Sequence, residues 1–220
     1  GRKDIEVLHN GAEQACSEIA SPPSNPFSEQ NSFVLCFIGG LFSHLHGDCI
    51  EDIFEAVSQI RQKFRWVEFH LYGQRQPADF LGDLIHSDGF THHGIVMPVE
   101  KKFEIMEKAH CFVIPSSFKE GKHRHYRYSF PTKLPELIAS GRPILSYGPK
   151  ETATNRILET NNLGLRIHDR SIPKLVESLE TLVGQYQESI KKFAPVSPMI
   201  MEKFSADSVR SKLKNILSFN

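Results

Sequence analysis

One short stretch of the chain, residues 128–145 with the sequence YSFPTKLPELIASGRPIL, carries side chains suited to binding a charged ligand. Its pattern predicts a helix over about 132–140. The first N–H groups of a helix lack partners within it, and the helix dipole makes that end mildly positive. Because Lys133 adds a full charge there, we expect an anion, most naturally a diphosphate. Glu136 is instead placed to accept hydrogen bonds from sugar hydroxyls, as acids do from ribose in nucleotide sites.

Structural roles account for the other unusual residues of this stretch. Pro135 falls in the first helical turn, where a missing N–H costs least. Gly141 suits the C-terminal cap, and Pro143 prevents the helix from continuing. For Glu136 the alternative is that it only complements the helix dipole. We favour the ligand role.

A pair of glycines, Gly39 and Gly40, ends the apolar run FVLCFIGG. Glycines let a backbone approach a phosphate closely, although a tight strand-to-helix turn would use them equally well. The surrounding sequence is not GxGxxG, which disfavours a nicotinamide or flavin dinucleotide. Farther along, Gly94 and the residues after it could present backbone groups to a base, but a core strand is the better interpretation of that segment alone.

Paired histidines raise the question of a metal site. The pairs are His44 and His46, His92 and His93, and His123 and His125. The last pair stands among Lys122, Arg124 and Arg127, whose charges oppose a dication. We therefore expect a solvated basic loop at 118–130, with no metal site and no cofactor. Walker, GxSxG and CxxC patterns are also missing from the sequence.

Alternating strands and helices must position these residues. The runs 33–40 and 111–117 are continuously apolar, which fits strands buried on both faces of a parallel sheet. Other strands are expected at 66–73, 91–98, 142–148 and 163–167, and helices at 47–64, 99–109, 132–140, about 152–160 and beyond. This order predicts an α/β fold: a doubly wound, Rossmann-like parallel sheet with helices on both faces. Ligands of such sheets bind at the carboxyl ends of the strands.

Composition narrows the class of protein. The 26 basic and 26 acidic side chains balance, so no global field favours nucleic acid as a partner. No apolar run approaches the roughly 20 residues of a membrane span, and no signal peptide is recognisable. Cys36 and Cys111 lie in apolar runs and are expected to be buried, as in a reduced, cytoplasmic protein. The chain begins with Gly1 rather than Met, which suggests a piece of a longer protein.

The order of these pieces resembles the C-terminal, donor-binding half of GT-B glycosyltransferases of group 1. The block FPTKLPELIASGRPIL is similar to the family's P-x-K-L-x-E-x-x-A-x-G-x-P-V. IEVLHNGAE, FVLCFIGGL, HHGIVMPVEKKFEIMEKAHCFVIPS and FSADSVRSKLKNIL resemble other family segments in the same order. The resemblance implies that 1–31 is a remnant of the interdomain linker and 32–220 the donor-binding domain with its C-terminal helices. The N-terminal acceptor domain would be absent from this chain.

The resemblance also implies a site and a reaction. Glu136 would hold the donor ribose, and Val96 would line the base. The diphosphate or donor sugar would face Gly39, Gly40, Ser129, Thr132 and Lys133. The family implies transfer of a sugar from a nucleoside diphosphate sugar, with retention and without a metal, to a sugar, lipid or polysaccharide acceptor. Because the acceptor site and often a catalytic His belong to the missing domain, no catalytic residue is assigned and the chain alone is expected to be inactive.

Two departures from the family pattern concern the diphosphate. Many relatives carry Arg after the first-loop glycine and then Lys-Gly, where this chain has Gly40 and later His46. Tyr128 replaces a glutamate eight residues before Glu136, and Glu120 lies in a longer loop. The basic residues from 123 to 127 could compensate. A non-hydrolysing type of nucleotide-sugar epimerase and a degenerate, non-catalytic binding domain stay open as alternatives. For the full-length protein, so does peripheral association with the inner face of the membrane.

Overall fold

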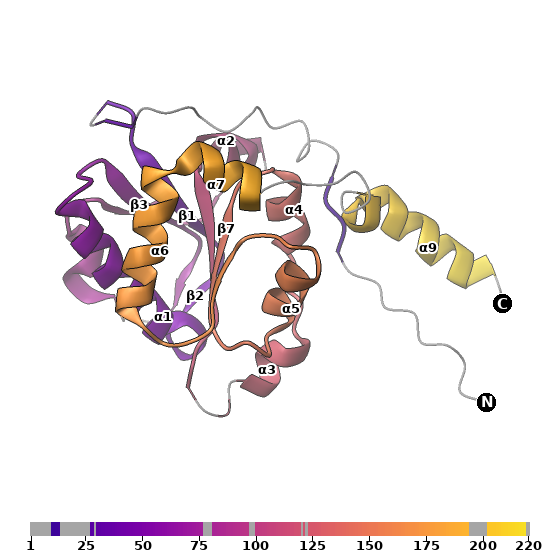
Figure 1. Cartoon of the computed structure of the whole chain (residues 1–220). Coiled ribbons are helices and arrows are strands. Elements are labelled where there is room, and N and C mark those ends of the chain that lie inside the picture. The colour runs from indigo at the N-terminus through magenta and orange to yellow at the C-terminus, as the bar shows by residue number, and fades with distance from the viewer. Residues whose placement is uncertain are drawn as a thin grey trace.

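The computed structural model describes residues 10–13, 27–28, 30–76, 81–96, 100–119, 121, 123–193 and 202–218. Figure 1 shows a sheet covered by helices, from which the last helix, α9 (Ala206–Ser218), projects to one side. The part of the segment IEVLHNGAE before Asn10 lies outside the described residues. Within them, no helix is both long and apolar enough to cross a bilayer.

The centre of the fold is a six-stranded parallel sheet in the order β5-β3-β1-β6-β7-β8. The strands are β1 (Phe33–Ile38), β3 (Val67–Tyr72), β5 (Phe90–His92), β6 (Cys111–Pro115), β7 (Ile144–Tyr147) and β8 (Leu165–Ile167). In the register of the central strands, Phe33 pairs with Val67 and Leu35 with Cys111. A separate short pair joins β2 (Leu41–Phe42) to β4 (Arg75–Gln76). The chain winds outward from β1 in one direction and from β6 in the other, so the order reverses between these two strands.

Helices cover both faces of the sheet. One face is covered by α1 (Ser43–Arg61), α6 (Ile172–Gly184) and α7 (Tyr186–Phe193), and the other by α2 (Glu100–Lys108), α4 (Leu134–Ala139) and α5 (Ala153–Thr160). Alternate β1 side chains enter the two cores: Leu35 packs with the first set of helices and Cys36 with the second. The predicted doubly wound, Rossmann-like sheet is therefore confirmed.

The expected thiol burial is also confirmed. Cys36 and Cys111 are fully buried in β1 and β6. Burial raises the pKa of Cys111 to about 12, and that of Cys36 further still, so both stay protonated at neutral pH. They act as small apolar side chains of the core.

Two predicted elements were wrong in detail. The segment 118–130 is not a loop throughout, because α3 (His123–Tyr128) forms within it. The phenol of Tyr126 donates a hydrogen bond to the Leu45 carbonyl in α1, which ties this short helix to the body of the fold. The third strand, expected over 91–98, ends at His92. A short 3-10 helix, η2 (Gly82–His86), precedes it.

The end of α4 shows why Gly141 and Arg142 follow it. Gly141 has φ +67°, which a residue with a side chain adopts only at a cost, so the predicted C-terminal cap is confirmed. Arg142 is 2% exposed, and its guanidinium donates to the carbonyls of Ala109 at 3.0 Å, Glu107 at 3.2 Å and Ser140 at 3.3 Å. It therefore joins the end of α2 to the end of α4.

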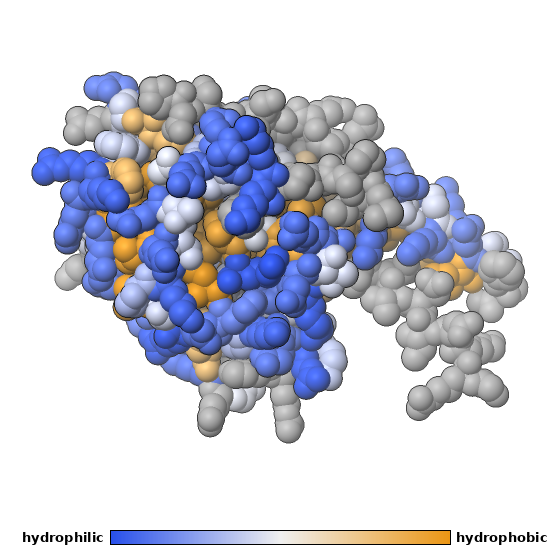
Figure 2. All heavy atoms as spheres, viewed as in Figure 1, coloured by the Kyte–Doolittle hydropathy of each residue, from blue (hydrophilic) through white to orange (hydrophobic). Residues whose placement is uncertain are grey.

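The segment around Ala12 contacts the beginning of α9. Ala12 N–H donates to the Phe204 carbonyl at 2.7 Å, and Ala206 N–H donates to the Ala12 carbonyl at 2.9 Å. A Cβ on Gly11 would lie 2.4 Å from Ala206 Cα, so only glycine permits this approach. In Figure 2 the far end of α9 carries exposed apolar side chains; Leu213, Ile216 and Leu217 are the exposed large hydrophobic residues of this helix.

Candidate functional site: two joined pockets at the strand reversal

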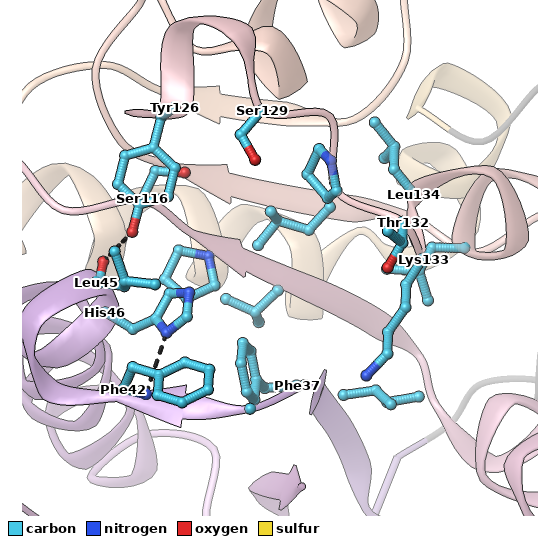
Figure 3. Close-up of a pocket in the computed structure, with 18 of the residues that line it drawn as sticks. Phe37, Phe42, Leu45, His46, Ser116, Tyr126, Ser129, Thr132, Lys133 and Leu134 are labelled. Carbon is cyan, nitrogen blue, oxygen red and sulfur yellow. Dashed lines mark hydrogen bonds between the residues drawn. The ribbon is translucent and has the colours of Figure 1, made fainter. Parts of the chain in front are cut away.

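Two neighbouring pockets open at the carboxyl ends of β1 and β6, where the strand order reverses. The first, which we call the central pocket, has a volume of about 370 Å³ and is shown in Figure 3. It lies between the glycine pair, the first turn of α1 and the segment 126–137. The second, the side pocket, has about 350 Å³ and lies toward β3 and the residues after β5. Ligands of doubly wound sheets bind at such a reversal.

The structure brings most of the predicted site residues together. Gly39, Gly40 and Lys133 line both pockets. Ser129 and Thr132 line the central pocket only, and Val96 lines the side pocket only. Glu136 lines neither.

Lys133 lies where the two pockets meet, immediately before α4. Burial lowers the pKa of its amine; the nearby Glu136 carboxylate opposes this effect and the positive charge of Lys102 adds to it. Among the described residues, no carboxylate lies within ion-pairing distance of Lys133 Nζ. In Figure 3 its side chain extends along one side of the central pocket. A half-buried amine without a carboxylate partner is suited to attract an anion.

The beginning of α4 differs from the expectation. The helix starts at Leu134 rather than near Thr132, and the Leu134 N–H donates to the Pro131 carbonyl at 3.0 Å. One of the N–H groups expected to face an anion is therefore already satisfied. The charge of Lys133 and the shape of the pocket, rather than the end of this short helix, make the position suitable for a phosphate.

Glu136 forms an ion pair with a residue that the sequence reasoning missed. Its Oε1 accepts a hydrogen bond from Lys102 Nζ at 2.7 Å, and each side chain is 20% exposed. Lys102 comes from α2 and lines the side pocket. Glu136, predicted to bind the ribose, therefore lies behind Lys102, whose side chain forms part of the wall of the side pocket. Nothing in the sequence pattern joins these residues, which are 34 positions apart.

Aromatic rings surround the glycine pair. A Cβ on Gly40 would lie 2.5 Å from Phe42 Cε2, and one on Gly39 would lie 3.0 Å from Phe37 Cζ. Phe37 and Phe42 both line the central pocket, as does Phe130. The wall where many relatives carry cations is therefore largely apolar here. His46 also lines this wall, and its Nδ1 accepts a hydrogen bond from the Phe42 N–H at 3.4 Å (Figure 3).

The other departures from the family pattern lie away from the pockets or outside the described residues. Tyr128 is 78% exposed and lines neither pocket. Glu120 and the side chains of residues 123–125 lie outside the described residues, so their expected role in replacing the missing cationic contacts to the diphosphate stays a prediction. Among the residues that are described, no cluster of three or more His, Cys, Asp or Glu side chains could hold a metal ion.

A buried polar network next to the central pocket was also missed. Asp52 of α1 accepts hydrogen bonds from the Tyr147 hydroxyl at 2.8 Å and from two nitrogens of Arg170 at 2.8 and 2.9 Å. One turn earlier, Asp48 accepts from the Phe118 N–H at 3.1 Å. The network holds the segment after β6 against α1, and so shapes the pocket. Two acids four residues apart on the apolar face of a predicted helix were the signal that could have revealed it.

A doubly wound parallel sheet with pockets at the reversal of its strand order is the architecture of a Rossmann-like domain. The family model described as glycosyl transferases group 1 matches residues 32–185. The chain belongs to this family, which confirms the resemblance seen in the sequence.

Solved structures show the same fold. HepE from Anabaena, in complex with UDP and glucose, matches with a TM-score of 0.66 and 14% identity over 87% of this chain and 50% of its own. WaaG, a glycosyltransferase involved in lipopolysaccharide biosynthesis, matches with a TM-score of 0.64 and 17% identity over 96% of this chain and 55% of its own. The C-terminal domain of LpcC from Francisella tularensis matches with a TM-score of 0.58 and 15% identity over 90% of this chain and 97% of its own.

These identities establish the fold alone. The chain spans about half the length of HepE and of WaaG, but nearly all of the isolated LpcC domain. No curated protein matches the chain in sequence.

Proposed function

We propose that this chain is the donor-binding half of a glycosyltransferase and binds a nucleoside diphosphate sugar in the two joined pockets. The observation that carries the proposal is Lys133, a half-buried amine without a carboxylate partner among the described residues, at the junction of both pockets. A diphosphate at this junction would have the nucleoside on one side of it and the sugar on the other. The complex of HepE with UDP and glucose is consistent with such a ligand.

Each part of the donor has a place in this arrangement. The base and ribose would occupy the side pocket near Val96, within reach of the Lys102–Glu136 pair. The diphosphate would lie against Lys133 and the backbone of Gly39 and Gly40. The sugar would extend into the central pocket toward Ser129 and Thr132.

The residues of this chain would position the donor, and the reaction would require a second domain. Lys133 would neutralise charge on the departing nucleoside diphosphate, which is the group that gains negative charge as the glycosidic bond breaks. Retention of the anomeric configuration and independence from metal ions are part of the proposal. The acceptor, a sugar, lipid or polysaccharide, would be bound by a domain outside this chain. Transfer needs both substrates held together, so the chain alone is proposed to bind the donor without transferring its sugar.

Calorimetric titration of the chain tests this function. UDP, GDP, CDP, ADP and dTDP are added separately, with and without magnesium. We expect one nucleotide to bind best, with the same affinity in both conditions. Lys133→Met should weaken that binding by about 1.5–3 kcal/mol, roughly ten- to a hundredfold, because it removes a charged hydrogen-bond donor. Lys101→Met, which removes an exposed charge on α2 away from both pockets, is the control.

The result that would overturn the proposal is the absence of binding by all five nucleotides. Equal weakening by Lys133→Met and Lys101→Met would also contradict it, because affinity would then depend on net charge rather than on the junction. A magnesium requirement would contradict only the metal-independent part.

The apolar wall formed by Phe37, Phe42 and Phe130 favours one second candidate, a binding domain that no longer recognises a nucleotide. That candidate predicts no affinity for any of the five nucleotides and no effect of Lys133→Met. The same titration therefore separates the two.

A further inference from the structure

Lys102 brings a second amine to the wall of the side pocket. It comes from α2, its side chain is 20% exposed, and it lines the side pocket together with Lys133. Its Nζ donates to Glu136 Oε1 at 2.7 Å. Two amines and one carboxylate thus gather at the edge of a single pocket.

Stability is a weak reason for such an arrangement. Removing two charges from water costs free energy that their attraction repays only in part, so a partly buried ion pair contributes little net stability. Lys133 forms no ion pair with a carboxylate among the described residues, and burial and the positive charge of Lys102 together lower its pKa although the nearby Glu136 carboxylate opposes them. With one carboxylate against two amines, the group carries a net positive charge that faces the pocket.

The geometry of the pair leaves Glu136 able to do two things at once. Lys102 uses Oε1, while a carboxylate can accept further hydrogen bonds through its second oxygen. The ribose and the first phosphate of a nucleotide are adjacent groups. A carboxylate and an amine held 2.7 Å apart could therefore meet these two groups together.

We propose that Lys102 is a second phosphate-binding cation of the donor site, positioned by Glu136, and that it contacts the diphosphate from the side pocket. This inference rests on the proposed function. It assigns the positive charge to α2, in a chain whose first glycine loop offers none. Lys102 would favour nucleotides over nucleosides.

The test compares a nucleoside diphosphate with its parent nucleoside. The tightest of UDP, GDP, CDP, ADP and dTDP and the corresponding nucleoside are titrated into the wild-type chain, Lys102→Met, Lys102→Arg and Lys101→Met. We expect Lys102→Met to weaken the diphosphate by about tenfold or more while changing nucleoside affinity by less than about twofold. Lys102→Arg should retain most of the diphosphate affinity, because it keeps the charge. The control Lys101→Met should change neither affinity.

A second pair of variants separates a direct contact from an indirect one. Lys102→Met also leaves the Glu136 carboxylate unneutralised, and that charge alone would repel a diphosphate. The same substitution is therefore made in the Glu136→Gln background, where the carboxylate is gone. A diphosphate loss of similar size in that background supports the direct contact, and its disappearance overturns the proposal.

Other outcomes also decide. Equal weakening of nucleoside and diphosphate by Lys102→Met would mean that Lys102 only maintains the shape of the pocket, which overturns the inference. If Lys133→Met weakens binding and Lys102→Met does not, the inference fails while the proposed function stands. If the wild-type chain binds none of the five nucleotides, both fail.

Discussion

Acidification should destabilise this protein through one buried histidine, His110. The side chain is 3% exposed and lies between Phe27, Phe33 and Tyr186. Its Nδ1 accepts a hydrogen bond from the Val34 N–H at 3.0 Å, so the neutral ring carries its proton on Nε2. Protonation would place a second proton on Nδ1 and break this bond.

The size of the effect follows from the pKa. Burial, with a smaller contribution from the nearby charge of Arg142, lowers the pKa of His110 from 6.5 to about 4. Between these values the unfolded chain binds a proton that the folded chain does not, so the free energy of unfolding falls as the pH falls. Relative to pH 7, the loss is about 1.2 kcal/mol at pH 5.5 and about 2.4 kcal/mol at pH 4.5. That is a large part of the roughly 5–15 kcal/mol that stabilises a typical domain.

Urea unfolding at pH 7.0, 5.5 and 4.5 measures this loss. His110→Asn is the informative variant, because an amide oxygen can still accept from the Val34 N–H but does not titrate. We expect the variant to be less stable than the wild type at pH 7 and to lose about 2 kcal/mol less on acidification. His86→Asn, at an exposed histidine, is the control and should follow the wild type. Parallel pH profiles for the wild type and His110→Asn would refute the reasoning.

Two further predictions concern contacts that the sequence did not reveal. Asp52→Asn removes the carboxylate charge that contacts both Arg170 and Tyr147, and should lower the free energy of unfolding in urea titrations by about 2 kcal/mol. Glu188→Gln, at an exposed ion pair, is the control and should leave that free energy unchanged. Similar losses in both variants would contradict a stabilising role for the network. Gly11→Ala places a Cβ against Ala206 and should speed amide hydrogen exchange at Ala12 and Ala206, while Gly184→Ala, with open space around it, should leave that exchange unchanged. Unaltered exchange in Gly11→Ala would show that the contact does not persist in solution.

Local patterns were enough to predict the sheet. The apolar runs at 33–40 and 111–117 became the two central strands because strands buried on both faces need apolar side chains at every position. Gly141 and Pro143 predicted the end of α4 for an equally local reason, since few residues adopt its left-handed cap. The glycine pair and Lys133 could be placed at the site because parallel strands direct their carboxyl ends to one edge.

Contacts between distant segments could not be predicted in this way. The Lys102–Glu136 pair depends on how α2 and α4 pack side by side, and its members look like ordinary surface charges in the sequence. The sequence of the basic segment 123–128 predicts a loop because it has no helical pattern of its own. The helix α3 is instead held by the hydrogen bond from Tyr126 to α1. Likewise, the sequence around Ala12 carries no sign that its backbone pairs with Phe204 and Ala206.

This last contact has a mechanical consequence. Two backbone hydrogen bonds join the segment around Ala12 to the start of α9, although the two are close to opposite ends of the chain. As long as both bonds hold, neither segment can rotate or slide without displacing the other. Force applied near residue 12 would therefore pass into α9 through these bonds, and into α4 through the contact of Ala12 with Ala139. The two segments should therefore move together as one unit relative to the sheet.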